Sequence, residues 1–221
     1  MMESRTSTSS TPIWSVDARW PQAEIIALAA SVIRSGGVVI YPTETFYGLG
    51  GDPRSDVAVE GVYRIKGRDF GKPLPLIAAD KASLRKVVAK WPPAAERLAE
   101  IFWPGPLTLV LAAASLLPPR VHAHTGKIAV RISSHPVAHS LATAAGGLLI
   151  STSANASGQP PFSEPAEMSS GFLSHVDGML DAGKLSGTLP STIVDVTGLA
   201  PRLLRSGCIP WESIQALFGG E

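Results

Sequence analysis

The chain has 221 residues, of which 45% are hydrophobic and 17% are charged. This length can bury a large core in one domain, and 21 glycines and 19 prolines indicate short elements joined by tight turns rather than a helical bundle. The net charge of +1 gives no sign of a strongly basic nucleic-acid-binding protein, and a single cysteine, Cys208, excludes a disulfide framework and a thiolate metal site.

The first residues are small and polar, so we predict a disordered tail over residues 1–13 and a folded domain over residues 14–221. Apolar residues at helical spacing predict a helix over Ala23–Arg34 that ends at Gly36-Gly37. Further helices are predicted over 56–66, 81–90, 92–102, after Pro136 and over 210–218. Strands are predicted over 38–41, 74–79, 107–113, 128–132, 148–151, 176–180, 192–196 and 202–204.

Strands that alternate with helices indicate an α/β fold, a single domain with a twisted sheet flanked by helices. Short spacings between strands in the last third indicate that this sheet is mixed rather than purely parallel. The longest apolar runs are only strand-sized, so we expect no membrane span. The tail lacks the features of a secretory signal, and we expect a cytoplasmic protein.

Residues 41–50, Tyr-Pro-Thr-Glu-Thr-Phe-Tyr-Gly-Leu-Gly, place two hydroxyls, a carboxylate and glycines at the end of a buried strand. In α/β sheets such strand ends line ligand crevices. The alternative is a capped turn in which Gly48, Gly50 and Gly51 take positive φ angles, and the segment alone favours neither interpretation. No Gly-Lys-Ser/Thr follows the glycines, so this segment is not a Walker phosphate loop.

Lys66-Gly67-Arg68 ends a predicted helix inside residues 64–90, which carry eight Lys or Arg and two Asp. Two cations around a glycine can converge on a polyphosphate, and a local excess of positive charge attracts phosphates. By itself, the pattern is more typical of an ordinary helix C-terminus, where basic residues suit the helix dipole and glycine ends the helix.

Residues 151–158, Ser-Thr-Ser-Ala-Asn-Ala-Ser-Gly, follow an apolar predicted strand. Their hydroxyl and amide groups can hydrogen-bond phosphate or carboxylate oxygens, although a loop of turn-forming residues has the same composition. Arg205 leaves another strand into a Ser-Gly turn, from which it could reach across a cleft or lie on the surface.

The five histidines form no set with the spacing of metal ligands, because neither His122 with His124 nor His135 with His139 has a third partner. We therefore assign no metal to protein side chains. No Gly-x-Ser-x-Gly motif is present, so the sequence makes no case for a Ser-His-Asp triad.

Taken together, seven segments resemble the YrdC family of threonylcarbamoyl-AMP synthases. In the family's order they are 41–50, 63–76, 103–111, 130–138, 151–161, 190–198 and 203–207. The family's fingerprint, Lys-x-Arg with Ser-x-Asn, stands here as Lys66, Arg68, Ser153 and Asn155. Seven matches in the family's order, across most of the chain, are far more specific evidence for this family than any one segment.

The resemblance implies a YrdC/RibB-like fold and L-threonylcarbamoyladenylate synthase activity. Such an enzyme forms threonylcarbamoyl-AMP and pyrophosphate from L-threonine, bicarbonate and ATP, with Mg²⁺ accompanying ATP. Partner proteins would use the product to make threonylcarbamoyl-adenosine in tRNA, and weak tRNA binding is an associated expectation.

The resemblance also implies roles for particular residues. It assigns catalysis to Lys66, Arg68, Ser153 and Asn155, and threonine binding to Thr45, Ser151 and Ser191. It assigns ATP binding to Arg68, Lys72, Thr108, Ser153, Pro161 and Arg205.

Two departures from the family pattern matter. Some relatives have a histidine that helps to hold threonine where this chain has Ile77, so that contact would be missing or replaced. Longer relatives carry a linker and a second domain, whereas this chain ends sixteen residues after Arg205. It therefore resembles the short, single-domain type, and closure of the site must come from elsewhere, or not at all.

Three alternatives belong to other classes. A non-catalytic module that binds tRNA or double-stranded RNA would use the cations of residues 64–90, but interleaved exposed aromatics are missing. The carbamoyl-transfer domain of hydrogenase-maturation proteins comes with zinc-finger segments, which Cys208 alone cannot supply. A butanone-phosphate synthase would need an acidic and histidine metal cluster. The sequence offers no firm general base, with Glu44 only a guess.

Overall fold

The computed structural model describes residues 11–67 and 69–219. It confirms the α/β class, but the strands divide between two mixed sheets instead of forming one. The first sheet has the order β1 (Ile13–Ser15), β9 (Gly178–Asp181), β2 (Val39–Tyr41), β3 (Gly48–Gly50) and β8 (Thr152–Ser153). The second has the order β11 (Arg202–Arg205), β10 (Thr192–Asp195), β5 (Leu107–Ala112), β6 (Lys127–Arg131), β4 (Leu76–Ala78) and β7 (Leu148–Ile150).

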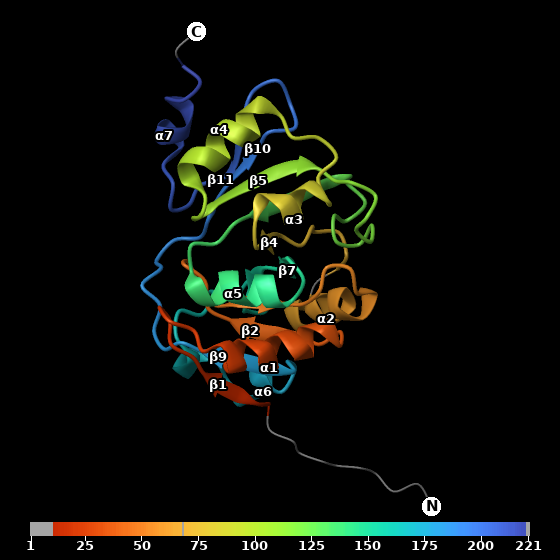
Figure 1. Ribbon diagram of the computed structural model, residues 1–221, viewed down its shortest axis with the longest axis vertical. Helices are drawn as coiled ribbons and strands as arrows, with labels where there is room; N and C mark the ends of the chain where they lie inside the picture. Colours follow the sequence, from red (N-terminus) through yellow and green to blue (C-terminus); the bar gives the residue numbers. More distant parts are fainter. Residues whose placement is uncertain (1–10, 68, 220–221) are drawn as a thin grey trace, which may run out of the picture.

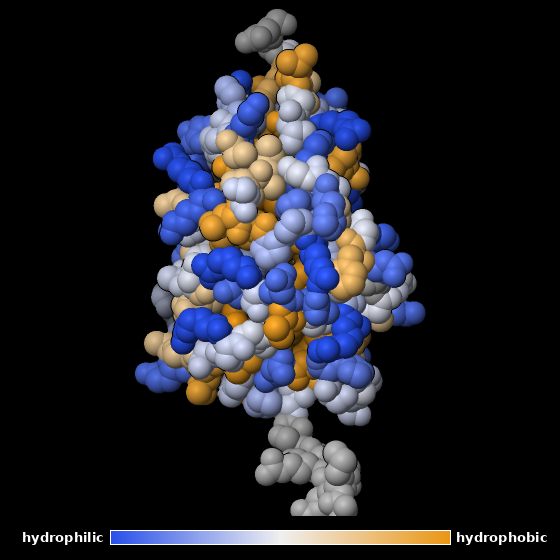
Figure 2. All heavy atoms as spheres, turned by 90° about the vertical axis from the view of Figure 1, so that its right-hand side faces the viewer, coloured by the Kyte–Doolittle hydropathy of each residue, from blue (hydrophilic) through white to orange (hydrophobic). Residues whose placement is uncertain are grey.

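The helices cover the sheets as Figure 1 shows. They are α1 (Ala23–Arg34), α2 (Asp56–Lys66), α3 (Lys81–Arg85), α4 (Pro93–Phe102), α5 (Pro136–Ala144), α6 (Ser170–Leu173) and α7 (Trp211–Gln215), with a 3₁₀ turn over Pro165–Glu167. No helix among the described residues is long and apolar enough to cross a membrane. The face shown in Figure 2 mixes hydrophilic side chains with smaller hydrophobic areas.

The two sheets are joined where β7 runs through Ser151 directly into β8. Beside this passage, the Ile150 amide donates a hydrogen bond to the Gly51 carbonyl at 2.9 Å. Strand pairing of this kind depends on contacts between distant segments, which hydrophobic periodicity does not specify. The prediction of one sheet was wrong for that reason, although most of the predicted strands are present in the structure.

Apolar side chains fill two cores on either side of this junction. Helices α1 and α5 lie side by side (Figure 1), and residues such as Ile33 and Leu141 pack with Tyr41, Ile77 and Leu149 of the strands. A larger cluster, which includes side chains of α2 and α4, fills the rest of the interior. Strands buried on both faces form continuous apolar runs, as the sequence of this chain does at β2, β4 and β7.

The folded chain begins before the end of the predicted tail. Ile13 starts β1, which pairs in parallel with β9, and the Thr11 hydroxyl donates to the Leu173 carbonyl at 2.7 Å. The assignment of residues 11–13 to a disordered tail was therefore wrong, while residues 1–10 lie outside the described residues. β1 has only three residues, too few for hydrophobic periodicity to reveal a strand.

Gly48 and Gly50 are strand residues rather than the turn residues of our alternative interpretation. None of Gly48, Gly50 and Gly51 has a positive φ angle, and Gly50 of β3 pairs with Val39 of β2. Glycine is required at position 50 for another reason, because an added Cβ would lie 2.5 Å from the Tyr41 ring. The predicted basic helix over 81–90 is also shorter, since α3 ends at Arg85 and Val88 bridges to Ala113.

Asp195 at the end of β10 gives a prediction for stability. Burial alone would raise the pKa of Asp195, but hydrogen bonds from Thr197 and Lys127 lower it from 3.8 to about 2. A lowered pKa contributes stability above the unfolded value, and that stability is lost as the pH falls through the folded value. We expect Asp195→Asn to reduce the free energy of unfolding by about 2 kcal/mol at pH 7, as urea titration measures.

The difference in the free energy of unfolding between the unaltered chain and Asp195→Asn should narrow as the pH falls from about 4 toward 2. Glu60→Gln is the control, because Glu60 forms an exposed ion pair with Arg120 and such pairs contribute about 0–1 kcal/mol. A loss for Asp195→Asn that stays constant across this pH range would contradict the assignment.

Candidate functional site

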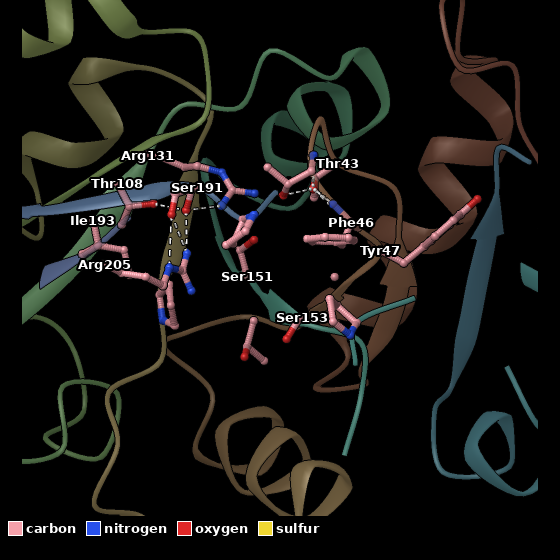
Figure 3. A pocket seen from close by; sticks show the side chains of 16 residues that line it. Thr43, Phe46, Tyr47, Thr108, Arg131, Ser151, Ser153, Ser191, Ile193 and Arg205 are labelled. Carbon is pink, nitrogen blue, oxygen red and sulfur yellow. Dashed lines mark hydrogen bonds between the residues drawn. The ribbon is translucent and has the colours of Figure 1, made fainter. Parts of the chain in front are cut away.

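A cavity of about 390 Å³ is lined by residues of both sheets. Figure 3 shows Thr108, Arg131, Ser191 and Arg205 on one side, with Ser151 between them and the loop of Thr43 and Phe46. The lining residues are Thr43, Thr45, Phe46, Tyr47, Gly48, Pro75, Thr108, Arg131, Ser151, Thr152, Ser153, Pro161, Pro190, Ser191, Ile193 and Arg205. The site therefore combines hydroxyl groups, two guanidinium groups and an apolar wall.

The loop after β2 is fixed by the Thr43 side chain. The Thr43 hydroxyl donates to the Phe46 carbonyl at 2.7 Å and accepts from the Thr45 amide at 3.2 Å. It also lies 3.0 Å from the Thr45 hydroxyl. Such local bonds are what favours threonine in tight turns, and here they hold the Thr45 side chain at the cavity wall.

Strand register places the polar groups of the second sheet together. Ile193 of β10 pairs with Thr108 of β5 on one side and with Arg205 of β11 on the other. Ser191 precedes β10, and its hydroxyl lies 2.8 Å from the Thr108 hydroxyl and accepts from Arg205 Nη2 at 3.0 Å. Arg205 also donates to the Ser191 carbonyl at 2.8 Å. Thr108 and Arg205 on this wall of the cavity therefore both contact Ser191.

Arg131 is a lining residue that our sequence analysis did not assign. It ends β6, its side chain is only 8% exposed, and its Nη1 lies 3.5 Å from the Ser191 hydroxyl. Its Nε lies 3.1 Å from the Glu44 carboxylate. The available signal was a single cation closing an otherwise apolar strand, Ile128 to Val130, inside the matched segment 130–138.

The two guanidinium groups are close enough to affect each other. Although part of Arg205 reaches solvent, desolvation and then the charge of Arg131 lower its pKa. Repulsion between two cations on one wall is relieved when an anion binds between them. This wall therefore suits a carboxylate or a phosphate.

Lys66 and Asn155 lie behind the lining residue Ser153. Lys66 is 3% exposed, and its Nζ donates to the Ser153 carbonyl at 2.7 Å and to Asn155 Oδ1 at 2.8 Å. Gly67 ends α2 with a φ of 58°, so the ordinary helix end that we considered is present as well. The ammonium group nevertheless points inward and joins α2 to β8.

Most of the predicted site residues share this cavity. Those that line it are Thr45, Thr108, Ser151, Ser153, Pro161, Ser191 and Arg205. Lys72 is exposed and is not a lining residue, and Arg68 lies outside the described residues. Ile77 is buried with Leu149 in the core beneath α5, so its side chain does not reach the cavity. The roles assigned to these residues remain predictions.

The described residues contain no group of three or more His, Cys, Asp or Glu side chains that could hold a metal ion. His135 precedes α5 and caps it by accepting a hydrogen bond from the Val137 amide at 3.3 Å. Desolvation lowers the pKa of His135, with an opposing effect from Glu44. We therefore attribute a structural role to this histidine.

The segment 182–190 closes one side of the site as it passes from β9 to β10. The Tyr47 hydroxyl donates to the Gly183 carbonyl at 2.7 Å and accepts from the Ala182 amide at 3.1 Å. Gly187 approaches the Thr45 backbone so closely that an added Cβ would lie 1.8 Å from the Thr45 carbonyl oxygen. Segment 182–190 therefore packs directly against the loop that carries Thr45.

Comparisons with known proteins agree with this geometry. The Sua5/YciO/YrdC family model, described as telomere recombination, matches residues 31–207. Threonylcarbamoyl-AMP synthase of Pyrococcus abyssi is 35% identical over 194 residues, which cover 88% of this chain and 57% of that protein. The protein of the same name from Nitrosococcus oceani is 39% identical over 172 residues, covering 77% of this chain and 92% of the relative.

A solved structure, Sua5 of P. abyssi in complex with L-threonine, has a TM-score of 0.90 at 34% identity. The match covers 95% of this chain and 61% of that one. The chain thus spans little more than half of the archaeal relative, but nearly all of the N. oceani protein.

Gly187→Ala tests the close packing of segment 182–190 on the site loop. Because the new methyl group would overlap the Thr45 carbonyl, the segment must move, and overpacking of this kind costs about 1–3 kcal/mol. We expect a lower free energy of unfolding in urea and faster amide hydrogen exchange over residues 43–47. Gly198→Ala is the matched control, since its Cβ would meet nothing nearer than 3.9 Å. Equal free energies of unfolding and equal exchange rates in Gly187→Ala and Gly198→Ala would show that the contact between Gly187 and Thr45 is unimportant.

Proposed function

The chain belongs to the Sua5/YciO/YrdC family, and from that premise we propose that it is a nucleotidyltransferase, a threonylcarbamoyl-AMP synthase. It forms threonylcarbamoyl-AMP, pyrophosphate and water from L-threonine, bicarbonate and ATP. The observation that carries the proposal is the cavity in which Arg131 and Arg205 converge on Ser191. Partner proteins in the cytoplasm then use the product to make threonylcarbamoyl-adenosine in tRNA.

The threonine end of the site is the part that contains Thr45, Ser151, Ser191 and Arg131. A buried guanidinium is the group best suited to a substrate carboxylate, because it offers charge-assisted hydrogen bonds in a fixed plane. Arg131 is also the register partner of Ile77 across β4 and β6. It thus lies beside the position where some relatives have a threonine-binding histidine, and we propose that it replaces that contact.

The ATP end is the part that contains Thr108, Ser153, Pro161 and Arg205, and the family resemblance adds Arg68 and Lys72, which follow α2 in the sequence. Lys66 acts here by holding Ser153 and Asn155, to which it is bonded, and by adding positive charge behind them. Mg²⁺ would accompany the ATP phosphates as part of the substrate.

The chemical step joins these two ends. The neutral amine of threonine takes up bicarbonate with loss of water, and an oxygen of the resulting carbamate attacks the α-phosphorus of ATP. The bond between that phosphorus and the bridging oxygen breaks, and pyrophosphate leaves with the electron pair. Arg68, Arg205 and the Mg²⁺ that enters with ATP would offset the charge that repels the attacking oxygen, while the enclosed cavity protects the unstable carbamate from water.

The RNA-binding alternative is not favoured, because relatives at 35–39% identity are named threonylcarbamoyl-AMP synthase and because two of the cations of residues 64–90 already have other roles. Lys66 is buried, and Lys81 on α3 forms an ion pair with Glu96 of α4 at 2.6 Å. A module of this kind would show RNA affinity that falls steeply with salt, and no threonine-dependent consumption of ATP.

The test of the proposed function is incubation of the purified chain with ATP, Mg²⁺, bicarbonate and each amino acid in turn. We expect pyrophosphate release that depends on threonine and bicarbonate, and a product with the mass of threonylcarbamoyl-AMP. Pyrophosphate release no higher than in the reaction without amino acid would refute the proposal.

Lys66→Ala and Arg68→Ala should each reduce the rate of pyrophosphate release by about 10²-fold or more, because they remove preorganised positive charge. Thermal unfolding should show that both variants remain folded, and Lys66→Met provides a variant that keeps the apolar stem of the buried lysine. Lys81→Ala is the control, since it removes a cation of the same region from a surface ion pair. Near-normal rates in the first two variants would contradict the assignment.

A further inference from the structure

Glu44 stands between two residues of the cavity wall but is not itself a lining residue. Thr43 and Thr45 line the cavity, whereas the Glu44 side chain is turned toward β6 and is 12% exposed. One carboxylate oxygen lies 3.1 Å from Arg131 Nε, and the other accepts a hydrogen bond from the Ser133 hydroxyl. With both oxygens engaged away from the cavity, this carboxylate is poorly placed for the general-base role that its sequence position suggested.

Arg131 depends on this carboxylate for its position. Its long side chain is nearly buried, and its contact with the Ser191 hydroxyl is long at 3.5 Å. The Nε of Arg131 makes no aligned hydrogen bond, so opposite charge is the main attraction between the two side chains. Without Glu44 the guanidinium would either remain as an uncompensated buried charge or move toward solvent.

Glu44 is itself held on both sides. The hydrogen bonds of Thr43 to Thr45 and Phe46 fix the backbone around it. Beyond β6, the Ser133 hydroxyl accepts from the His135 amide at 3.2 Å, which ties it to the start of α5. The ion pair therefore connects two rigid segments, the loop after β2 in the first sheet and the end of β6 in the second.

We propose that Glu44 is a positioning residue that acts through Arg131, fixing its guanidinium for the carboxylate of the amino-acid substrate. This inference rests on the proposed function, and it deepens that function by assigning Glu44 to threonine binding rather than to proton transfer. Because Glu44 touches neither the cavity nor the ATP end, its removal acts selectively on one substrate.

The experiment compares Glu44→Ala, Glu44→Gln, Arg131→Ala and the double variant Glu44→Ala/Arg131→Ala in the pyrophosphate-release reaction. For Glu44→Ala we expect the KM for threonine to rise by about 10-fold or more, since a displaced positioning group is costly. The KM for ATP should change less than about 3-fold, and Glu44→Gln should fall between Glu44→Ala and the unaltered chain because it keeps hydrogen-bonding oxygen and nitrogen atoms. In the Arg131→Ala background, Glu44→Ala should add less than about 2-fold.

Three results would overturn the inference while leaving the proposed function intact. They are an unchanged or lowered KM for threonine in Glu44→Ala, equal effects on both substrates, or a full effect of Glu44→Ala in the absence of Arg131. Asp195→Asn is the matched control for general destabilisation, because it removes another buried, paired carboxylate that does not line the cavity. Should Glu44→Ala fail to fold, the isosteric Glu44→Gln decides between the same outcomes. If the unaltered chain shows no threonine-dependent reaction, it is the proposed function that fails.

Discussion

The buried contact between Arg131 and Glu44 is the interaction on which the arrangement of the site depends. A guanidinium group inside a protein must be neutralised by a partner and held by hydrogen bonds, or it costs several kcal/mol. Here the partner comes from the other sheet, so the requirement for compensation also fixes how the loop after β2 sits against β6. Ser191 then brings Arg205 to the same wall, and the charges that would bind an anion are set before any ligand arrives.

The opposite side of the cavity contains a second buried cation. Lys66 is almost fully buried, and its ammonium group donates to the Ser153 carbonyl and to the Asn155 amide oxygen. These bonds fix the positions of Ser153, which lines the cavity, and of Asn155. In the proposed reaction, the substrate carboxylate needs one well-aimed guanidinium, whereas a polyphosphate needs positive potential and many donors.

Sequence reasoning found the features that depend on local physics and missed those set by distant contacts. The helix over Ala23–Arg34 and the Gly67 helix end follow from neighbouring residues alone. The division into two sheets and the strand at Gly48–Gly50 depend on which segments pair across the fold. Seven of the sixteen cavity residues were predicted, because seven ordered segments matched a family. Arg131 lay inside one of these segments, but a cation at the end of an apolar strand does not by itself show that its side chain is buried and faces the cavity.

Closure of the site follows from a constraint on backbone rather than on side chains. The two sheets enclose a cavity only if the segment that links β9 to β10 can lie directly on the loop carrying Thr45, and Gly187 permits that approach because it has no Cβ. Tyr47 anchors the start of the same segment through its hydroxyl, and burial raises the pKa of Tyr47 to about 12, so the hydroxyl remains a donor at neutral pH. A side chain at position 187 would separate the segment from the loop. In the proposed reaction, the wall that would shield an unstable carbamate from water therefore depends on a residue that takes no part in binding it.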